Sequence, residues 1–539
     1  MTFFTAADAG ASAGNPILNM TVFVAFIVIT LGIVAYASKK PQKSASDFYT
    51  GGASFSGTQN GLAIAGDYLS AASFLGIVGA IALTGYDGFL YSIGFFVAWL
   101  IALLLVAEPL RNTGKFTMAD VLSFRLKQRP VRVAAAFATL GVSLFYLVAQ
   151  MAGAGALVSV LMDIHDKTAQ AGIVAVVGVV MIAYVLIGGM KGTTIVQMIK
   201  AVLLCSCVVI MVIIIFVLVK GNFSELLARA VESHGGNTAI LEPGLKYGKT
   251  DVTKLDFIAL GLSLALGVAG LPHVLMRFYT VPTAKEARRS VTWAIILIGS
   301  FYLLTLVLGY AAAAFVGPER IKGAPGGANA AAPLLALELA GPIFMAVISA
   351  VAFATVLAVV AGLAITASAS VAHDFYNSVL RNGQATEEEQ VRVSRITVVI
   401  IGIAAILLGI GAMSQNVAFL VSLAFCVAAS ANVPTILYSL YWKRFNTTGA
   451  VASLWTGLLT AIVLIIFSPA VSGSETSVLP NADFAWFPLT NPGLVSIPAG
   501  FLAGIIGTFL GKPDNFDELQ SEMEVRSLTG VGVEKPVDH

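Results

Sequence analysis

Long runs of apolar residues dominate this 539-residue chain. About 20 apolar residues are needed to cross a bilayer as an α-helix, because each residue adds about 1.5 Å. With 58% hydrophobic and 11% charged residues, the chain also differs from soluble domains, in which about 25% are charged. The sequence therefore predicts an all-α integral membrane protein with about 13 transmembrane helices. The predicted spans are 17–37, 57–84, 87–108, 131–162, 170–189, 193–219, 255–276, 291–316, 333–372, 395–413, 416–441, 449–468 and 494–510.

Basic residues between the runs predict the orientation of the chain, because short cytoplasmic loops are enriched in lysine and arginine. Basic residues follow the odd-numbered spans, for example at 39–43, 111–129 and 443–444, whereas 469–493 contains none. We expect a plasma-membrane protein with its N-terminus outside, its C-terminus in the cytoplasm and an odd number of crossings. No basic residue precedes the first apolar run, so we expect no cleaved signal peptide.

The same pattern divides the chain into five parts and argues against several classes of protein. We find no Walker-type phosphate loop, metal-ligand cluster or nucleophile elbow, so we expect neither an enzyme nor a cofactor. The net charge of +2 predicts no nucleic-acid partner, and the three cysteines, all inside apolar runs, predict no disulfide. The parts are 1–45 (tail and leading helix), 46–220 (a first five-helix unit), 221–445 (an extracellular loop and a second five-helix unit), 446–511 (two helices) and 512–539 (a tail expected to be disordered).

One carboxylate, Asp67, lies inside the apolar run AIAGDYLSAASFLG (63–76). A charge inside a span costs about 2.5–3.5 kcal/mol on insertion scales, so it usually faces a transport pathway. Nearby glycines and the hydroxyls of Ser70 and Ser73 favour a helix interrupted within the membrane. Free carbonyls at such a break can bind a cation, and free N–H groups can bind an anion. Alternatively, Asp67 lies at the cytoplasmic edge of its span or pairs with a lysine of another helix.

A second interrupted helix is predicted in GLSLALGVAGLPHVLMRFYT (261–280), where Gly267, Gly270 and Pro272 punctuate one apolar segment. With one helix in front, spans two to six and seven to eleven form two units of five helices each. Because five is odd, the two units have opposite topology, which is the arrangement of an inverted repeat.

Several stretches resemble the sodium:solute symporter family, and within it the bacterial cation/acetate symporters. The resemblance extends from about Lys43 to Gly511 and rests on the order of the stretches. They are SDFYTGGASFSGTQNGLAIAGDYLSAASFLG (46–76), GKFTMADVLSFRL (114–126), YVLIGGMKGTTIVQMIKAVLL (184–204), GLPHVLMRFYTVPTAKEARRSV (270–291) and SLAFCVAASANVPTILYSLYWKRFNTTGA (422–450).

The resemblance implies a LeuT-like inverted repeat plus flanking helices and symport by alternating access. It further implies import of short-chain monocarboxylates (acetate, propionate, pyruvate), coupled to a proton or sodium. A same-fold symporter for proline, a sugar or pantothenate stays open, as does a monocarboxylate channel. A channel would need a continuous polar pore, whereas the polar residues here cluster at two helix breaks.

The family's cation-linked acid falls on Asp67, and its proline-histidine-arginine pattern falls on Pro272, His273 and Arg277. Arg277 could equally be a basic anchor at the cytoplasmic face. His273 could relay protons or simply pack between helices. Lys200 could snorkel to the inner surface or act as a counter-charge for the substrate.

The substrate is expected where the second and seventh spans are interrupted, because helix N-termini there hold an anion without a dedicated arginine. The amide of Gln150 could bind the carboxylate, although a hydrogen bond between helices would explain it equally well. Asn432 precedes Pro434, which is expected to kink the eleventh span. The candidate substrate-binding residues are Ser70, Ser73, Gln150, Gly267, Gly270, Leu271 and Asn432.

The coupling cation is expected beside Asp67. In sodium-coupled relatives a Ser/Thr pair of the ninth span completes an oxygen cage with carbonyls of the first core helix. An ungapped count back from Asp374 places Ala358 and Val359 at that pair, and neither side chain carries an oxygen. Sodium would thus depend on Thr355 or water, whereas a proton needs only one titratable group. The candidate cation-coupling residues are Ala63, Asp67, Thr355, Ala358 and Val359, and proton coupling is at least as well supported as sodium coupling.

Overall fold

A computed structural model describes residues 16–37, 53–114, 116–474, 476–514 and 517–531 of the chain. The helices of its first half are α1 (Pro16–Ala37), α3 (Gly57–Tyr68), η2 (Ala72–Gly76), α4 (Ile77–Thr84), α5 (Tyr86–Leu105), α6 (Ala107–Thr113), α7 (Met118–Leu122), α8 (Gln128–Met162), α9 (Lys167–Leu218) and α10 (Phe223–Ser233). Those of the second half are η3 (Thr238–Leu241), α11 (Asp251–Gly267), η4 (Val268–Gly270), α12 (Pro272–Phe278), α13 (Ala284–Phe315), α14 (Pro318–Gly323), η5 (Gly327–Ala330), α15 (Ala331–Ala369), η6 (Ser370–Leu380), α16 (Glu387–Gly411), α17 (Val417–Tyr441), α18 (Thr447–Ile466), α19 (Gly493–Leu510) and α20 (Asp517–Thr529).

The described helices confirm an all-α membrane protein. Eleven of them are long and apolar enough to cross a bilayer, and the bent pair Gly57–Tyr68 and Ala72–Thr84 raises the number to as many as twelve. Each predicted span from 57–84 onward falls on one of these helices or on the bent pair. The leading span falls on α1, whose described apolar part, Pro16–Ile29, is shorter, so the count of thirteen stays a prediction.

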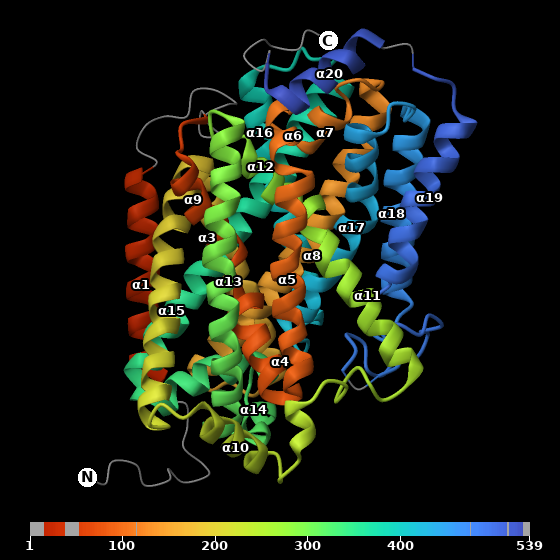
Figure 1. Ribbon diagram of the computed structural model, residues 1–539. Helices are drawn as coiled ribbons and strands as arrows, with labels where there is room; N and C mark the ends of the chain where they lie inside the picture. The colour runs from red at the N-terminus through yellow and green to blue at the C-terminus, as the bar shows by residue number, and fades with distance from the viewer. Residues whose placement is uncertain (1–15, 38–52, 115, 475, 515–516, 532–539) are drawn as a thin grey trace.

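The helices form one elongated bundle, with the start of α1 and the helix α20 at opposite ends (Figure 1). This placement agrees with an odd number of crossings. The tail at 512–539 was expected to be disordered, but residues Asp517–Thr529 form α20. This helix is held in place because Met523 is buried and the side chain of Asn112 donates to the carbonyl of Ser527 over 3.1 Å.

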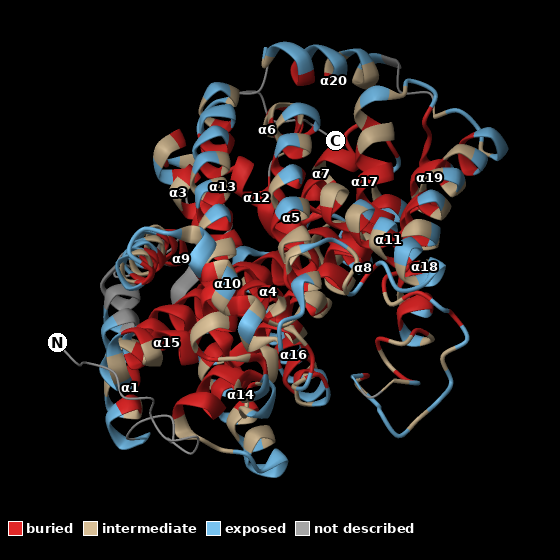
Figure 2. Ribbon diagram, turned by 60° about the horizontal axis from the view of Figure 1, so that its bottom comes forward, coloured by how far each residue is buried: buried red, intermediate tan, exposed pale blue. Residues whose placement is uncertain are grey.

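Two helices form the centre of the bundle. In an apolar 18-residue stretch of α17, 94% of the residues are buried. The corresponding share is 83% for the segment from η5 to η6 and 33% for each of the two spans of α9. Figure 2 shows α4, α8, α12 and α15 mostly buried, whereas α13 and α20 have exposed outer faces. The outer helices therefore have lipid-facing sides, and α15 and α17 pack within the protein.

The first interruption separates α3 from η2 and α4, which meet at an angle of 58°. Leu69 leaves helical geometry at φ −72° and ψ 77°, so the helical hydrogen-bond ladder ends there. α3 packs closely on its neighbours because a Cβ at Gly61 would lie 2.8 Å from the carbonyl oxygen of Ser290 and one at Gly66 2.2 Å from that of Gln197. Small residues of this kind let membrane helices approach each other closely.

The second interruption lies between α11 and α12. The chain passes through the short 3₁₀ turn η4 and becomes extended at Leu271 (φ −77°, ψ 111°), and Pro272 then opens α12 at its first turn. Proline is favoured there because it has no N–H to leave unpaired. Both predicted interruptions are therefore present in the structure.

The two longest predicted spans are long helices, one of them bent. α8 has 35 residues, and α15 has 39 residues with non-helical geometry at Ala340 and Gly341, just before Pro342. Proline removes a helical hydrogen bond and explains this kink.

Candidate functional site

Asp67 occupies the last turn of α3, directly before the first interruption. It is buried, with 2% of its surface exposed. The guanidinium of Arg277 on α12 donates to Asp67 Oδ2 over 2.7 Å, and Arg277 is itself 1% exposed. The two interrupted helices are therefore joined by a buried ion pair whose two residues are 210 positions apart in the sequence.

Two side chains of α9 complete this ion pair. Arg277 Nη1 donates to Thr194 Oγ1 over 2.7 Å, and Arg277 Nη2 donates to the amide oxygen of Gln197. The amide nitrogen of Gln197 donates in turn to Asp67 Oδ1. Gln197 thus bridges acid and base, which satisfies buried charges that would otherwise be costly.

These contacts correct two of the alternatives drawn from the sequence. Arg277 is not a basic anchor at the cytoplasmic face, because its guanidinium is buried against Asp67. Asp67 does pair with another helix, as one alternative proposed, but the partner is an arginine rather than a lysine. An arginine is always charged in proteins, so Asp67 faces a fixed positive charge.

The α15 segment expected to bind the cation lies beside Asp67. A Cβ at Gly362 would stand 3.2 Å from Asp67 Oδ1, so this glycine leaves room for the carboxylate. The carbonyl of Ala358 accepts from Gln197 Nε2 at 3.3 Å, and that of Thr355 accepts from Lys200 Nζ at 2.9 Å. The Thr355 hydroxyl donates to the carbonyl of Ala352 in its own helix. Ala63 and Val359 are fully buried.

Lys200 does not snorkel to a surface. Its side chain comes from the second span of α9 and is 2% exposed. Because its ammonium bonds a backbone carbonyl of α15, it belongs to the same buried region as Asp67 and Gln197.

Next to the interruptions, several buried polar atoms have no hydrogen-bond partner among the described residues. They are Ser70 Oγ, both amide atoms of Gln150 and both ring nitrogens of His273. The ring of His273 lies 5.2 Å from that of Tyr146, one turn before Gln150 on α8. Buried polar groups in folded proteins are nearly always paired, so a cluster of unpaired ones marks a place for a polar ligand or for water.

Other predicted substrate residues shape the same interruptions. Ser73 Oγ donates to the carbonyl of Tyr68 over 3.0 Å and contacts the Tyr302 hydroxyl at 2.9 Å. Asn432 Nδ2 donates to the carbonyl of Gly270 over 2.7 Å, while its Oδ1 has no partner in the described part of the chain. A Cβ at Gly270 would stand 2.5 Å from the carbonyl of Ala428, and one at Gly267 would stand 2.6 Å from Phe425. Leu271 is fully buried.

Aromatic rings enclose this region. Tyr68 makes edge or tilted contacts with Phe95, Trp99, Tyr302 and Phe425, with ring centroids 5.1–6.5 Å apart. All five side chains are at least 97% buried. An enclosure of this kind limits the size of a ligand and excludes bulk water.

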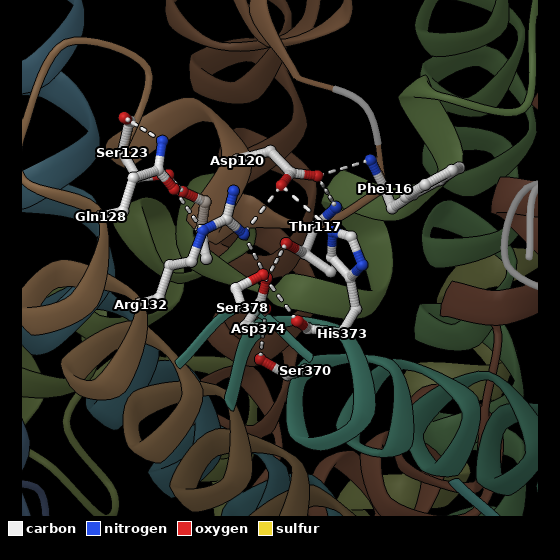
Figure 3. Close-up of polar contacts among 11 residues, drawn as sticks. Phe116, Thr117, Asp120, Ser123, Gln128, Arg132, Ser370, His373, Asp374 and Ser378 are labelled. Atoms are coloured by element: carbon white, nitrogen blue, oxygen red, sulfur yellow. Dashed lines mark hydrogen bonds and ion pairs between the residues drawn. The ribbon is translucent and has the colours of Figure 1, made fainter. Parts of the chain in front are cut away.

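A second polar cluster lies toward the end of the bundle that carries α20 (Figures 1 and 3). Arg132 Nη1 on α8 lies 2.9 Å from Asp120 Oδ1 on α7 and 2.8 Å from Asp374 Oδ1 on η6. Thr117 and Ser370 also donate to Asp374, each over 2.9 Å. This arginine-centred cluster therefore ties three segments together.

The arginine-centred cluster also contains a possible metal-ligand group, Asp120, His373 and Asp374, whose ligand atoms lie within 4.8 Å of one another. The guanidinium of Arg132 already bonds both carboxylates, as Figure 3 shows, and would repel a cation. Burial alone would raise the pKa of Asp120, but Arg132 and then His373 hold that pKa well below its usual range. We interpret the cluster as a charge network rather than a metal centre.

The sequence interpretation missed three contacts: the pairing of Arg277 with Asp67, the bridging amide of Gln197 and the arginine-centred cluster. A signal existed for the first, since an arginine and an aspartate occur in the two interrupted helices and buried charges require partners. For Gln197, a single amide within an apolar run indicates no particular partner. For Arg132, no local pattern distinguishes a buried arginine from a basic loop residue.

Comparison with known proteins identifies the family of the chain. The family model for the sodium:solute symporter family matches residues 48–457. The chain belongs to the sodium:solute symporter family. A protein of Corynebacterium glutamicum named monocarboxylic acid transporter is 72% identical over 549 residues and is covered completely, as is this chain. A Bacillus subtilis protein named uncharacterized symporter YwcA is 48% identical over 522 residues, which cover 96% of this symporter and all of the relative.

The fold agrees with this assignment. The structure of a Na⁺-coupled sialic acid symporter in a substrate-bound outward-open state matches with a TM-score of 0.70 at 17% identity. The match covers 94% of this symporter and all of that chain. The expected family and the expected fold class are thereby confirmed, and the chain is a membrane transporter of small solutes.

Proposed function

We propose that this symporter imports short-chain monocarboxylates, such as acetate, propionate and pyruvate, across the plasma membrane together with a cation. Support comes first from the 72% identity to a protein named monocarboxylic acid transporter, which extends over both whole chains. The transport cycle would be alternating access, in which the region between the interrupted helices opens to one side at a time.

The observation that carries the proposal is the group of unpaired polar atoms at the interruptions. Ser70 and Gln150 offer hydrogen-bond donors, and His273 offers ring nitrogens at the first turn of α12. A small carboxylate needs only a few donors, and the N-terminal end of a helix adds about half a positive charge. The surrounding aromatic side chains favour a ligand with a short apolar tail over a sugar, which would need many more hydrogen bonds.

A cavity at the end opposite α20 supplies a route of entry. It has a volume of about 430 Å³ and is lined by residues that include Gly79, Tyr91, Lys246, Asp256 and Asn416. The ammonium of Lys246 lies 4.9 Å from the ring centre of Tyr247 and 5.9 Å from that of Tyr91. The lining thus holds one charge of each sign, of which the Lys246 ammonium would contact an anionic substrate.

For the coupling ion, the surroundings of Asp67 argue against a sodium site, which leaves the proton as the ion that we propose. Ala358 and Val359 provide no side-chain oxygen, and the carbonyls of Thr355 and Ala358 accept from nitrogen donors. Sodium is a hard cation that needs several oxygen ligands. Arg277 already neutralises Asp67, so the carboxylate offers sodium no unpaired negative charge.

Uptake of labelled acetate into proteoliposomes tests the substrate and the ion. Unlabelled propionate and pyruvate should compete, whereas acetamide, proline, glucose and pantothenate should not. Accumulation should collapse with a protonophore and persist when choline replaces sodium at fixed pH and membrane potential. Equal competition by acetamide, or strict sodium dependence, would contradict the corresponding half of the proposal. Non-saturable uptake without accumulation would indicate a channel.

A further inference from the structure

Lys200 is a buried lysine that has no role in the proposed transport mechanism. Its side chain is 2% exposed, and its ammonium donates to the carbonyl of Thr355 over 2.9 Å. The Thr355 hydroxyl points back to the carbonyl of Ala352 and not toward a shared ligand. The ammonium therefore occupies the face of α15 on which the sodium-coupled members of the family are expected to bind their ion.

The neighbouring oxygens are also engaged by nitrogen. Gln197 Nε2 donates to the carbonyl of Ala358 and to Asp67 Oδ1, and Arg277 donates to Asp67 Oδ2. Each of these oxygens could otherwise be a cation ligand. Val359 and Ala358 contribute only hydrocarbon side chains at the two positions where hydroxyls were expected. The residues present thus do not form an oxygen cage for sodium.

The charges lead to the same result. Asp67 and Arg277 form a pair with no net charge, and they are the charged groups that act on Lys200. α1, α8, α13, α15 and α16 also pack against α9, and none of their charged residues is among the groups that act on Lys200. α1 contains no charged residue, and the only one in α15 is Glu338, close to the kink at Ala340 and Gly341. With Lys200 charged, the region carries one positive charge, and a sodium ion would add a second in a place shielded from water.

We propose that Lys200 is a built-in cation that takes the place of the coupling sodium on α15, so that this symporter binds no sodium there. A bound ion leaves the site in each cycle, whereas this ammonium is tethered to α9 and remains. The inference uses acetate uptake, and hence the proposed function, for only one of its two tests. The other test measures sodium binding itself.

The first experiment measures ²²Na⁺ binding to the purified full-length protein, with sodium-dependent thermal stabilisation as a second readout. The unmodified protein should show neither. In a triple variant, Lys200→Ala removes the ammonium, and Ala358→Ser with Val359→Thr restores two hydroxyls. It should gain ²²Na⁺ binding that lithium or excess cold sodium displaces. The matched control is Ala358→Ser/Val359→Thr with Lys200 retained, which should bind at least about tenfold more weakly.

Two results would overturn the inference. One is saturable ²²Na⁺ binding to the unmodified protein that excess cold sodium displaces. The other is equal sodium binding by the control and the triple variant. If the triple variant does not fold, the measurement on the unmodified protein and the control still decides the question. Failure of the unmodified protein to transport acetate would reject the proposed substrate but would not alter these binding results.

The second experiment measures acetate uptake in the triple variant. Uptake by the triple variant should depend on sodium, with a rate at least about tenfold higher in sodium medium than in choline medium. Uptake by the unmodified protein should be the same in both media. Lys200→Arg keeps a positive charge and should stay insensitive to sodium, which separates the charge from a general packing effect. Sodium dependence in Lys200→Arg equal to that of the triple variant would contradict the inference.

Discussion

Arg277 on α12 and Asp67 on α3 form an ion pair across 2.7 Å at the point where the two interrupted helices meet. Both side chains are shielded from solvent, and Gln197 on α9 bonds each of them. Replacing one partner of such a buried pair destabilises the protein, because the remaining charge is left without a counter-charge. The pair therefore links the stability of the bundle to the transport site.

Asp67→Asn is expected to destabilise the protein by about 3 kcal/mol as well as abolish acetate accumulation, because Arg277 loses its counter-charge. Asp67→Asn/Arg277→Gln, which removes both charges, should recover part of the lost thermal stability but not the uptake. Thermal unfolding in detergent and uptake in proteoliposomes provide the two readouts. Wild-type melting and uptake in Asp67→Asn would refute this role.

Ser70→Ala and Gln150→Leu are expected to raise the KM for acetate by about tenfold each, since each removes a hydrogen bond to a charged ligand. Protein level in the membrane should stay normal because neither side chain has a hydrogen-bond partner among the described residues. Ser453→Ala is the matched control, as its hydroxyl donates to the carbonyl of Gly500 between α18 and α19. A larger change in KM for Ser453→Ala than for Ser70→Ala would contradict the placement of the substrate.

Asp120→Asn is expected to loosen the arginine-centred cluster and to increase the reactivity of a cysteine introduced beside η6. The folded-state pKa of Asp120 is depressed, so its stabilising contribution is present above the unfolded pKa of about 4. That contribution is lost only as pH falls through the lower folded value. The melting difference between wild type and Asp120→Asn should therefore be present at about pH 5, shrink in stronger acid, and become smaller toward about pH 8 as His373, 3.5 Å from Asp120, loses its proton. Asp251→Asn, in the exposed pair with Lys254, is the control and should change melting little.

Arg125 is expected to anchor the last turn of α17. Its guanidinium donates to the carbonyls of Ser439 (3.2 Å) in the last turn and of Trp442 (2.9 Å) and Phe445 (2.8 Å) just beyond the helix end. Burial lowers the pKa of Arg125 to about 10, so the side chain stays charged at neutral pH. Arg125→Leu should cost about 2–4 kcal/mol in unfolding experiments, and Arg125→Lys less. Equal melting of Arg125→Leu and wild type would show that the carbonyls are satisfied by other means.

The sequence by itself determined the class of the protein, the place of its helices and the positions of its two interruptions. These features depend on local properties: the length of apolar runs, the clustering of glycine and the missing N–H of Pro272. Each acts within one segment, so each can be recognised without knowing which other segment packs against it. The family was recognisable for the same reason, because its stretches are contiguous in sequence.

Only the tertiary structure decided which buried charges meet. Arg277 and Lys200 are both basic residues in apolar surroundings, and either could have paired with Asp67, snorkelled or anchored a helix end. In the packing of α3, α9, α12 and α15, Arg277 bonds the carboxylate of Asp67, whereas Lys200 bonds a backbone carbonyl. Such pairing depends on the angle and register of helices far apart in the chain, which local composition does not encode, and on the cost of leaving any one charge without a partner.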